Sequence, residues 1–558
     1  MLAASLSFVA ILALSIKHPS MHIIKSTLWA FFLFLGFGAS AQNAPFSLQL
    51  EPLSISNLGG VQSYAVGQHN GVWLIVGGRL DGLHRRQPWA AFDQAGHNNQ
   101  IWAVDPEAGQ RWVAPLSSLP VPIQEHLSAT NPQFYQQNDT LFVLGGYGYS
   151  ATADDHITHD KLTAIAVPQV INALKNNSSF TSYFQQITDP QFQVTGGRLK
   201  KMGNRFYLLG GQKFMGRYNP MGPNHGPGFV QEYTNAVRIF SLSNAGTNLS
   251  VVHHPGFSDT TELHRRDYNA EAQILPNGEE AITMFSGVFQ PQVDLPFLNA
   301  VTVQASGYNP EPNFQQYYNH YHCAVLPLFS ATDSAMHTVF FGGIAQYYDQ
   351  NGTLIKDDNV PFVNTIARVT RNSAGAMAEY KMPVTMPALL GAGSEFIANE
   401  SLPHYANGVL KLDSLPADTV LAGYIFGGIS SSAPNIFFTN NGTQSSATAQ
   451  IFKVLLTTNT SLDLDALNPA SVQGLNLRVF PNPHESALQV KYFLAQTSTV
   501  KISITAAHGA LVYEETREYQ PAGERLWQKE LTELQPGQPY LLTIEAGGLR
   551  QSQKIFRK

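Results

Sequence analysis

Short apolar runs that end in two glycines, or in a close substitute, recur along the chain. Each run has the length of a buried strand, and the glycines provide a stop at which the backbone can leave the strand with unusual dihedral angles. Recurrence of one strand with the same stop predicts a repeat architecture. The six runs cover residues 73–78, 141–146, 206–211, 282–287, 339–343 and 424–428.

The segments around each run predict further strands. One strand precedes the run, and a segment that alternates apolar and polar residues follows it, as in a half-buried strand. In the first repeat a fourth strand is expected at 111–114. Four antiparallel strands repeated six times predict an all-β chain with a six-bladed β-propeller over residues 42–457. The third strands are expected at 100–105, 162–167, 236–240, 300–303, 364–369 and 449–454.

The last repeat lacks an obvious fourth strand after Val454. Residues 48–54, near the expected mature N-terminus, resemble the fourth strand of the first repeat at 111–117, since both contain a Pro-Leu-Ser end. We therefore expect the N-terminal segment to complete the last blade, which would remove the exposed sheet edges that a propeller must hide.

A second β-pattern follows a polar stretch at 458–474, which is rich in Thr, Ser and Asn and is typical of a linker. Residues 475–558 contain short alternating strands separated by turn residues, which predict a compact sandwich. Its strands are expected at 477–483, 488–492, 500–504, 540–544 and 554–558.

The first forty residues contain two apolar runs. The second has the parts of a signal peptide, namely a basic residue at Lys25, an apolar segment at 28–37 and an Ala-Ser-Ala cleavage site at 39–41. We expect residues 1–41 to be a signal peptide, with Met21 as the true start. The alternative, two membrane helices, is weaker because each run is shorter than the roughly 20 residues needed to span a bilayer. No membrane span is expected in the mature chain.

Composition excludes some classes of function. Charged residues make up only 13% of the chain, the net charge is −6, and no long basic block occurs. A nucleic-acid surface needs clustered Lys and Arg, so we expect no nucleic-acid partner. The chain has one cysteine, Cys323, which excludes an internal disulfide framework.

The repeats resemble the Kelch family of β-propellers. The first repeat carries the resemblance best, with Gly77-Gly78, the strand 99–105 and Trp112, whereas later repeats keep the glycines and mostly lack the tryptophan. The resemblance covers about residues 43–457 and implies a fold, not an activity.

The tail resembles the type A C-terminal sorting domain of the type IX secretion system of Bacteroidetes. The opening 479–483 reads Val-Phe-Pro-Asn-Pro, a glycine turn lies at Gly509, and the chain ends in a basic segment. The acidic residue usual before the glycine turn is absent, with Ala507 and His508 in its place. The resemblance implies export through the inner and outer membranes by the type IX machinery, followed by release or surface attachment, with the tail removed.

Long connections follow the glycine stops and should open on one face, where binding residues held by a rigid scaffold are expected. They span 79–99, 147–160, 212–234, 288–298, 344–363 and 429–447. Aromatic rings are frequent in them and would suit the flat faces of a glycan, although they could equally pack the connections' own small cores. Examples are Trp89, Phe92, Tyr147, Tyr149, Tyr218, Tyr233, Tyr347 and Tyr348.

A repeated Leu-His-Arg-Arg tetrad supplies the candidate ligand-binding residues. It occurs once in the first long connection and once at the entry to the fourth inner strand, where an aspartate follows it; the fifth inner strand has a His-Tyr-His entry. Arginine recognises carboxylate or phosphate well, whereas the alternative is a structural ion-pair network around the channel. The candidates are His84, Arg85, Arg86, His264, Arg265, Arg266, Asp267, His320, Tyr321 and His322.

The sequence contains few residues in a pattern typical of a metal or cofactor site. His156 and His159 could hold a divalent ion, but two histidines on a loop do not set a geometry. Cys323 next to Tyr321 and His322 invites comparison with copper radical oxidases, but adjacent strand residues point to opposite faces. We expect no cofactor and no metal.

These features predict a secreted or cell-surface protein that binds a glycan or a protein without catalysis. One alternative is a carbohydrate-active enzyme, a lyase, epimerase or hydrolase, that uses His and Arg residues at the channel mouth as acid, base and anion clamp. The other is a structural adhesion component. If His84, His264, His322 and the arginines meet at one void, the enzyme alternative gains.

Overall fold

The structure is a computed structural model that describes residues 45–219, 229–245, 248–350, 353–458, 475, 477–494, 496–506 and 509–558. The predicted all-β fold is confirmed: strands dominate the described residues, and only two α-helices occur among them, α1 (Val121–Leu127) and α2 (Val167–Lys175). No helix in the described ranges is long and apolar enough to cross a membrane. The expected signal peptide at 1–41 lies outside the described residues.

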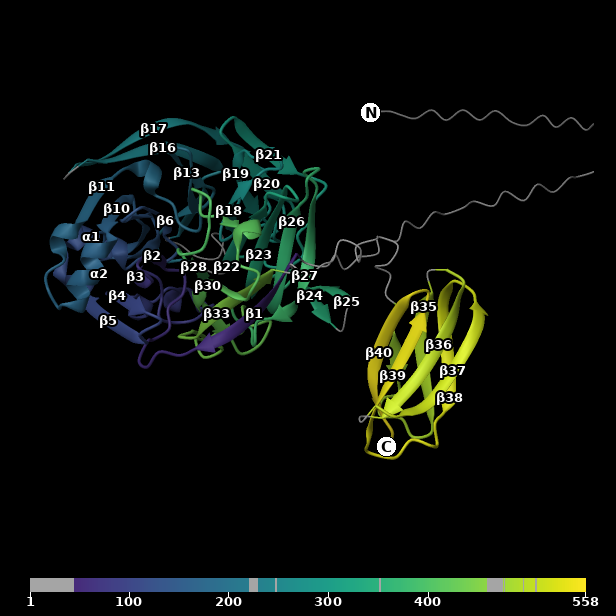
Figure 1. The fold of residues 1–558 in the computed structure, drawn as a ribbon. Coiled ribbons are helices and arrows are strands. Elements are labelled where there is room, and N and C mark those ends of the chain that lie inside the picture. The colour runs from purple at the N-terminus through teal and green to yellow at the C-terminus, as the bar shows by residue number, and fades with distance from the viewer. Residues whose placement is uncertain are drawn as a thin grey trace, which may run out of the picture. The chain divides into compact units, whose positions relative to one another are not determined.

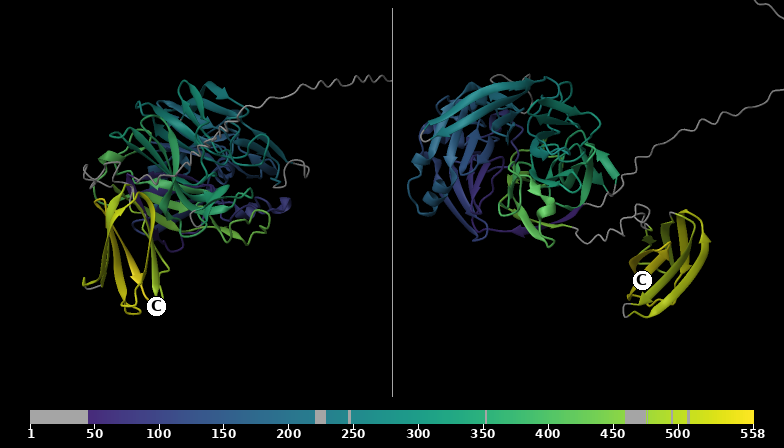
Figure 2. Two further views of the ribbon diagram at one scale, coloured as in Figure 1. Left: turned by 90° about the vertical axis from the view of Figure 1, so that its right-hand side faces the viewer. Right: turned by 45° about the horizontal axis from the view of Figure 1, so that its top comes forward.

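Antiparallel sheets follow one another along the described parts of residues 46–458, and each takes four strands from one repeat, except that the N-terminal segment supplies one strand of the last sheet. Figure 1 shows these sheets placed around a common centre, and the right-hand view of Figure 2 shows the same succession from purple through teal to light green. The first three sheets are β2 (Ala65–His69), β3 (Val72–Val76), β4 (Gln100–Asp105) and β5 (Gln110–Pro115); β6 (Gln133–Gln137), β7 (Thr140–Leu144), β10 (Lys161–Ala166) and β11 (Phe184–Thr188); and β12 (Arg198–Met202), β13 (Arg205–Leu209), β16 (Ala236–Ala245) and β17 (Asn248–Ser258).

The next three sheets continue the pattern. They are β18 (Asn269–Ile274), β19 (Glu280–Phe285), β20 (Ala300–Gln304) and β21 (Gly307–Glu311); β22 (Ala324–Ser330), β23 (Ala335–Ile344), β26 (Phe362–Arg371) and β27 (Met377–Thr385), with the short β29 (Leu410–Lys411) parallel to β22; and β28 (Ser394–Ala398), β30 (Val420–Gly427), β33 (Ile451–Thr458) and β1 (Phe46–Leu53).

Strand β1 joins the two ends of this part of the chain. It pairs antiparallel with β33 along its whole length, from Phe46 opposite Thr458 to Leu53 opposite Ile451. The expectation that the N-terminal segment completes the last sheet is therefore confirmed. Thr458, which was expected to begin the linker, is the last residue of β33; residues 459–474 lie outside the described ranges.

A cycle of backbone hydrogen bonds links the six inner strands just before each begins. The N–H of each residue in the cycle donates to the carbonyl of its counterpart in the neighbouring sheet, at distances of 2.7–3.3 Å. We call these six residues the inner ring. In order they are Ser63, Asn131, Gly196, Asp267, His322 and Gly393, and the N–H of Ser63 closes the cycle on the carbonyl of Gly393.

The glycine stops form a second set of links between sheets. In each repeat the N–H of the second glycine donates to a carbonyl of the next sheet, as Gly146 does to Val194 at 2.9 Å. Gly145 has φ +64°, and a Cβ there would overlap the same Val194 carbonyl. The fourth repeat tolerates a side chain, because Ser286 adopts φ 54° and its hydroxyl donates to the carbonyl of Phe297. The stops thus allow close approach of neighbouring sheets.

Four of the six long connections contain hairpins, which were not predicted from the sequence. Each of their strands is only three or four residues long and therefore carries little apolar pattern. Two hairpins combine into one sheet, β15-β14-β9-β8, and the other two stand alone. The strands are β8 (Tyr147–Ser150), β9 (Asp155–Thr158), β14 (Gln212–Met215), β15 (Val230–Tyr233), β24 (Tyr347–Gln350), β25 (Thr353–Lys356), β31 (Ile429–Ser431) and β32 (Ser445–Ala447).

The C-terminal part has its own sheets and its own core around Trp527, which is fully buried. The expected strands at 488–492, 500–504 and 540–544 are present, whereas the two at 511–530 were not predicted. Their many charged residues face solvent and hide the apolar alternation. The strands are β34 (Arg478–Phe480), β35 (Ala487–Leu494) and β38 (Gly523–Glu530) in one sheet, and β36 (Ser498–Ala506), β37 (Leu511–Gln520), β39 (Pro539–Ala546) and β40 (Leu549–Phe556) in the other.

Candidate functional site

A cavity of about 590 Å³ lies over the inner ring. Five of the six ring residues line it, and the remaining walls come from the long connections of the repeats. On the other side of the ring, the interior narrows to a void of about 10 Å³ bounded by Tyr64, Arg198 and Tyr268. This second void is too small for an organic ligand, whereas the cavity itself is bordered by the long connections.

Aromatic side chains make up much of the cavity wall. They touch one another edge to face, as aromatic rings prefer: the rings of Tyr218 and Phe92 are 5.6 Å apart, and those of Phe214 and Tyr147 are 5.5 Å apart. Of the eight rings named from the sequence, four line the cavity and Trp89, Tyr149, Tyr347 and Tyr348 do not. The lining rings are Phe92, Tyr147, Phe214, Tyr218, Tyr233, Phe289, Tyr321, Phe437 and Phe438.

Arg266 is one of two arginines that line the cavity, together with Arg79. Its Nη1 donates to Asp267 at 2.6 Å and its Nε donates to the Tyr233 hydroxyl at 3.0 Å. Burial works against the charge, but Tyr233 and Asp267 outweigh it and raise the pKa of Arg266, so the guanidinium stays charged. The guanidinium carbon of Arg266 lies over the ring of Phe289, 5.2 Å from its centroid. The result is a fixed donor beside a fixed carboxylate acceptor.

His264 lies flat against Tyr233, with ring centroids 3.7 Å apart, and its Nδ1 is 2.7 Å from Oδ1 of Asn235. Burial and the nearby Arg266 lower the pKa of His264, so the ring is neutral. A neutral ring that donates from Nδ1 to the Asn235 carbonyl leaves Nε2 as an acceptor.

His84 enters the cavity from the first long connection. Its ring stacks on Phe92 at 5.4 Å and meets Tyr218 and Phe437 edge-on. Burial lowers the pKa of His84 to about 4. His84 is therefore a neutral polar group within an aromatic wall.

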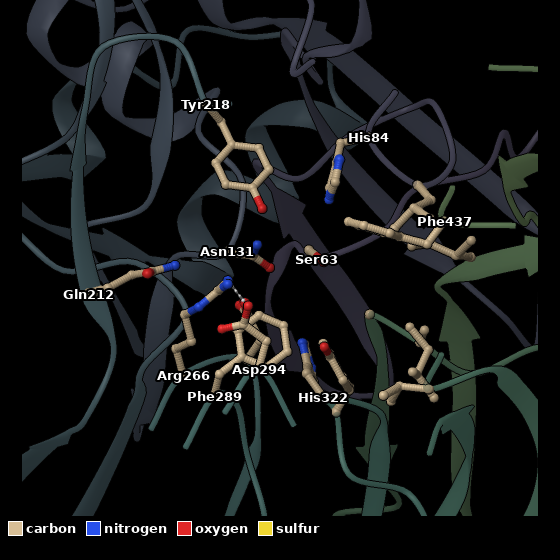
Figure 3. Close-up of a pocket in the computed structure, with 18 of the residues that line it drawn as sticks. Ser63, His84, Asn131, Gln212, Tyr218, Arg266, Phe289, Asp294, His322 and Phe437 are labelled. Atoms are coloured by element: carbon tan, nitrogen blue, oxygen red, sulfur yellow. Dashed lines mark hydrogen bonds and ion pairs between the residues drawn. The ribbon is translucent and has the colours of Figure 1, made fainter. Parts of the chain in front are cut away.

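His322 lies next to the carboxylate of Glu395. Its Nε2 is 2.7 Å from Oε1 of Glu395, and the same oxygen is 3.6 Å from Nη1 of Arg198. Burial lowers the pKa of His322. Burial would raise the pKa of Glu395, but His322 and Arg198 outweigh this effect and lower it. A neutral imidazole whose Nε2 faces the Glu395 carboxylate leaves Nδ1 as an acceptor. Figure 3 shows His322, Arg266, His84 and Tyr218 directed toward one space.

Tyr218 and Tyr321 bring phenol groups to the same space. Burial raises the pKa of both, so they are neutral hydroxyl donors. The cavity lining thus combines two paired arginines, three neutral imidazoles and several phenols, a set that can donate to and accept from several hydroxyl groups of one small ligand.

Six of the ten candidate residues line this cavity, namely His84, His264, Arg266, Asp267, Tyr321 and His322. The two histidines of the repeated tetrad, 180 positions apart in the chain by the difference of their numbers, therefore meet at one void. The remaining four residues, Arg85, Arg86, Arg265 and His320, do not line it.

Arg265 is structural, which favours the ion-pair interpretation at this position. Its side chain is fully buried, and its guanidinium donates to Glu262, Ser286 and Asn299 at 2.7–3.1 Å while stacking on Phe297 at 4.0 Å. Burial lowers its pKa to about 10. The guanidinium ties the fourth inner strand to the connection that follows it.

His320 is structural as well. It is fully buried, its Nε2 donates to the carbonyl of Gln316 at 2.8 Å, and its Nδ1 accepts from the N–H of Gln346 at 3.0 Å. Arg86 lies over the ring of Phe438, with its guanidinium carbon 5.0 Å from the centroid, and Arg85 lies close to Gly442.

The other candidates for chemistry are buried elsewhere. Cys323 is buried outside the cavity lining, and burial raises the pKa of its thiol to about 12. His156 contacts the carbonyl of Phe92 at 2.9 Å. No group of three or more His, Cys, Asp or Glu residues that could hold a metal ion occurs within the described ranges.

Sequence reasoning missed several residues in and beside the cavity. Glu395 is the second residue of the sixth inner strand and lies outside the cavity lining. It has no motif around it, so only the closure of the sheets brings it to His322. Arg79 directly follows a glycine pair, and this position was the one available signal; its guanidinium pairs with Asp81 at 2.5 Å and donates to the carbonyl of Asp93. Phe289 was likewise in a connection already expected to form the binding face.

Comparison with known proteins gives a match to one family and distant likenesses to solved structures, two of which follow. No curated protein sequence matches the chain. The structure of YjhT aligns with 73% of this chain and 99% of its own, at 11% identity and a TM-score of 0.38. A glycoside hydrolase family 43 arabinoxylan arabinofuranohydrolase from Bacillus subtilis, in complex with cellotetraose, aligns with 90% of this chain and 93% of its own, at 10% identity and a TM-score of 0.23. At these TM-scores neither likeness bears on the function.

The tail gives a firmer match. Residues 478–558 match the secretion system C-terminal sorting domain family, in agreement with the resemblance seen in the sequence. This range contains all seven strands of the C-terminal sheets. The chain therefore carries a type IX sorting domain, which marks it for handling by that secretion system and for export to the cell surface or the extracellular space.

Proposed function

We propose that residues 45–458 form a six-bladed, Kelch-like β-propeller that binds a sugar or short glycan in its central cavity after export. The six sheets, the closed inner ring and the pairing of β1 with β33 support the propeller. The cavity carries the functional proposal, because its volume of about 590 Å³ suits a small molecule better than a protein surface.

The chemistry of the wall favours a sugar. Aromatic rings offer flat apolar faces, and the polar groups between them are fixed by their own partners before a ligand arrives. Arg266 and Asp267 together offer donors and an acceptor with little net charge, which suits hydroxyl groups. The three neutral histidines add acceptors without adding charge.

Loss of the Arg266 guanidinium should strongly weaken this binding. We expect Arg266→Ala to weaken glycan binding by about 30-fold or more, because charged hydrogen bonds in a buried site contribute about 2 kcal/mol or more. The measurement is a glycan array followed by titration calorimetry on the purified protein. Arg205→Ala changes an exposed arginine outside the cavity and serves as the matched control. Equal binding by wild type and Arg266→Ala would refute the proposed site.

A second candidate function is catalysis on the bound sugar, and the contact between His322 and Glu395 favours it. A carboxylate that orients a neutral imidazole toward a cavity is the arrangement of a general base, and Arg266 could stabilise a developing anion. This is the lyase, epimerase or hydrolase alternative.

Catalysis and simple binding differ in their response to Glu395→Gln. If His322 is a base, this variant should lower turnover by about 100-fold or more while leaving glycan affinity within a few-fold, since the amide cannot favour the reactive state of the imidazole. The measurement is chromatography of each array ligand after incubation with the protein. If the wild-type protein leaves every ligand chemically unchanged, catalysis on the tested sugars is excluded and the binding function stands.

The third alternative, structural adhesion, does not need the cavity. Adherence to cells or matrix that survives Arg266→Ala would support it.

We further propose that residues 1–41 are a signal peptide with Met21 as the start, that 458–474 include the linker, and that the sorting domain at 475–558 is removed or used for attachment. Mass determination of the exported protein tests both ends.

A further inference from the structure

The cavity has an aromatic extension on its open side. From Tyr218 inside the cavity, ring contacts run to His84 at 5.0 Å, on to Phe437 at 5.6 Å and then to Phe438 at 5.2 Å. Phe438 lines the cavity but is 55% exposed, whereas Phe437, His84 and Tyr218 are half-buried. It therefore lies where the cavity meets solvent.

The exposed ring is held in place. Arg86 covers part of it, with the guanidinium carbon 5.0 Å from the ring centroid. The backbone N–H of Arg86 donates to the carbonyl of Asn440 at 3.2 Å, and the Asn440 amide donates to the carbonyls of Leu83 and His84 at 2.8 and 2.9 Å. The two connections that carry Arg86 and Phe438 are thus bonded to each other, and an exposed aromatic ring kept rigid in this way is suited to contact a ligand.

We propose that Phe438 and Arg86 form an outer sugar subsite, so that the protein recognises the end of a glycan chain, with the terminal residue in the cavity and the next residue on Phe438. The inference rests on the proposed function. The void beyond the inner ring measures only about 10 Å³ and is too small for a sugar, so a chain that fills the cavity would end there. The flat ring would contact the apolar face of the second sugar, and the guanidinium would donate to its hydroxyl groups.

Ligand length tests the outer subsite. For each monosaccharide that binds on the array, its disaccharide and tetrasaccharide are titrated against the purified protein. The disaccharide should bind about 10-fold more tightly than the monosaccharide, and Phe438→Ala should remove this gain by lowering disaccharide affinity about 10-fold more than monosaccharide affinity. Tyr519→Ala, which truncates an aromatic side chain that is 81% exposed in the sorting domain, should change neither value.

Labelled chains test end recognition. A bulky fluorophore on one end of the tetrasaccharide should abolish binding, whereas the same label on the other end should be tolerated. Tolerance of both labels, equal affinity for mono- and disaccharide, or equal losses for both in Phe438→Ala would each overturn the outer subsite and leave the cavity proposal standing. Failure of every sugar to bind would instead overturn the proposed function, and the subsite with it.

Discussion

Gly145→Ala is expected to destabilise the protein by about 2–5 kcal/mol. The alanine would have to adopt a positive φ, at a cost of about 1–2 kcal/mol, and its Cβ would overlap the backbone carbonyl of Val194 in the next sheet, which adds about 1–3 kcal/mol. Because that carbonyl also accepts the N–H of Gly146, the link between two sheets would be disturbed. The measurement is urea unfolding monitored by tryptophan fluorescence.

Gly71→Ala separates the two contributions. Gly71 also has a positive φ, +76°, but a Cβ there meets nothing within 4 Å. This control should lose only the backbone term of about 1–2 kcal/mol. Equal losses in the two variants would show that contact between sheets at the glycine stop does not limit stability.

Acidification is expected to unfold the protein between pH 6.5 and 4. Burial lowers the pKa of His97 and His337 to about 3 and that of His159 and His320 to about 4, against about 6.5 in the unfolded chain. The unfolded state therefore takes up protons that the folded state does not. Their stabilisation is complete above pH 6.5 and is lost as the pH falls, by about 2 kcal/mol for each histidine at pH 5.

His320 offers the sharpest test of this mechanism, because protonation of its Nδ1 would break the hydrogen bond from Gln346. The difference in unfolding free energy between pH 7.5 and 5.0 should be smaller by about 2 kcal/mol in His320→Gln than in wild type. His404→Gln, at an exposed position, should leave this difference unchanged. A wild-type stability that does not depend on pH in this range would contradict the prediction.

The strand pattern was readable because burial acts on each repeat separately. An apolar run is buried whichever sheet is next to it, so strand β4 was found at its bounds, 100–105, and the run 339–343 marked the second half of β23. Strand β37 was missed because a sheet with one solvated face needs few apolar residues. The hairpins in the long connections were missed because their strands of three or four residues carry little pattern.

The candidate site was found only in part, for a different reason. His84 and His264 were named because a tetrad repeats, and repetition is visible in a sequence. Glu395 stands alone, and its role follows from a neighbour 73 positions away, by the difference from His322. No local pattern could have paired the two.

The sequence by itself determined that the chain is built from repeated strands with glycine stops and that it ends in an export domain, since both depend on local apolar alternation and on short motifs. The tertiary structure alone decided which polar residues share a cavity. Arg265 and Arg266 are neighbours in one tetrad, yet the backbone directs the first into buried carbonyls and the second toward the central cavity. That choice depends on how the sheets close around the inner ring, because contacts between distant segments, and not the identity of the residue, fix where each side chain points.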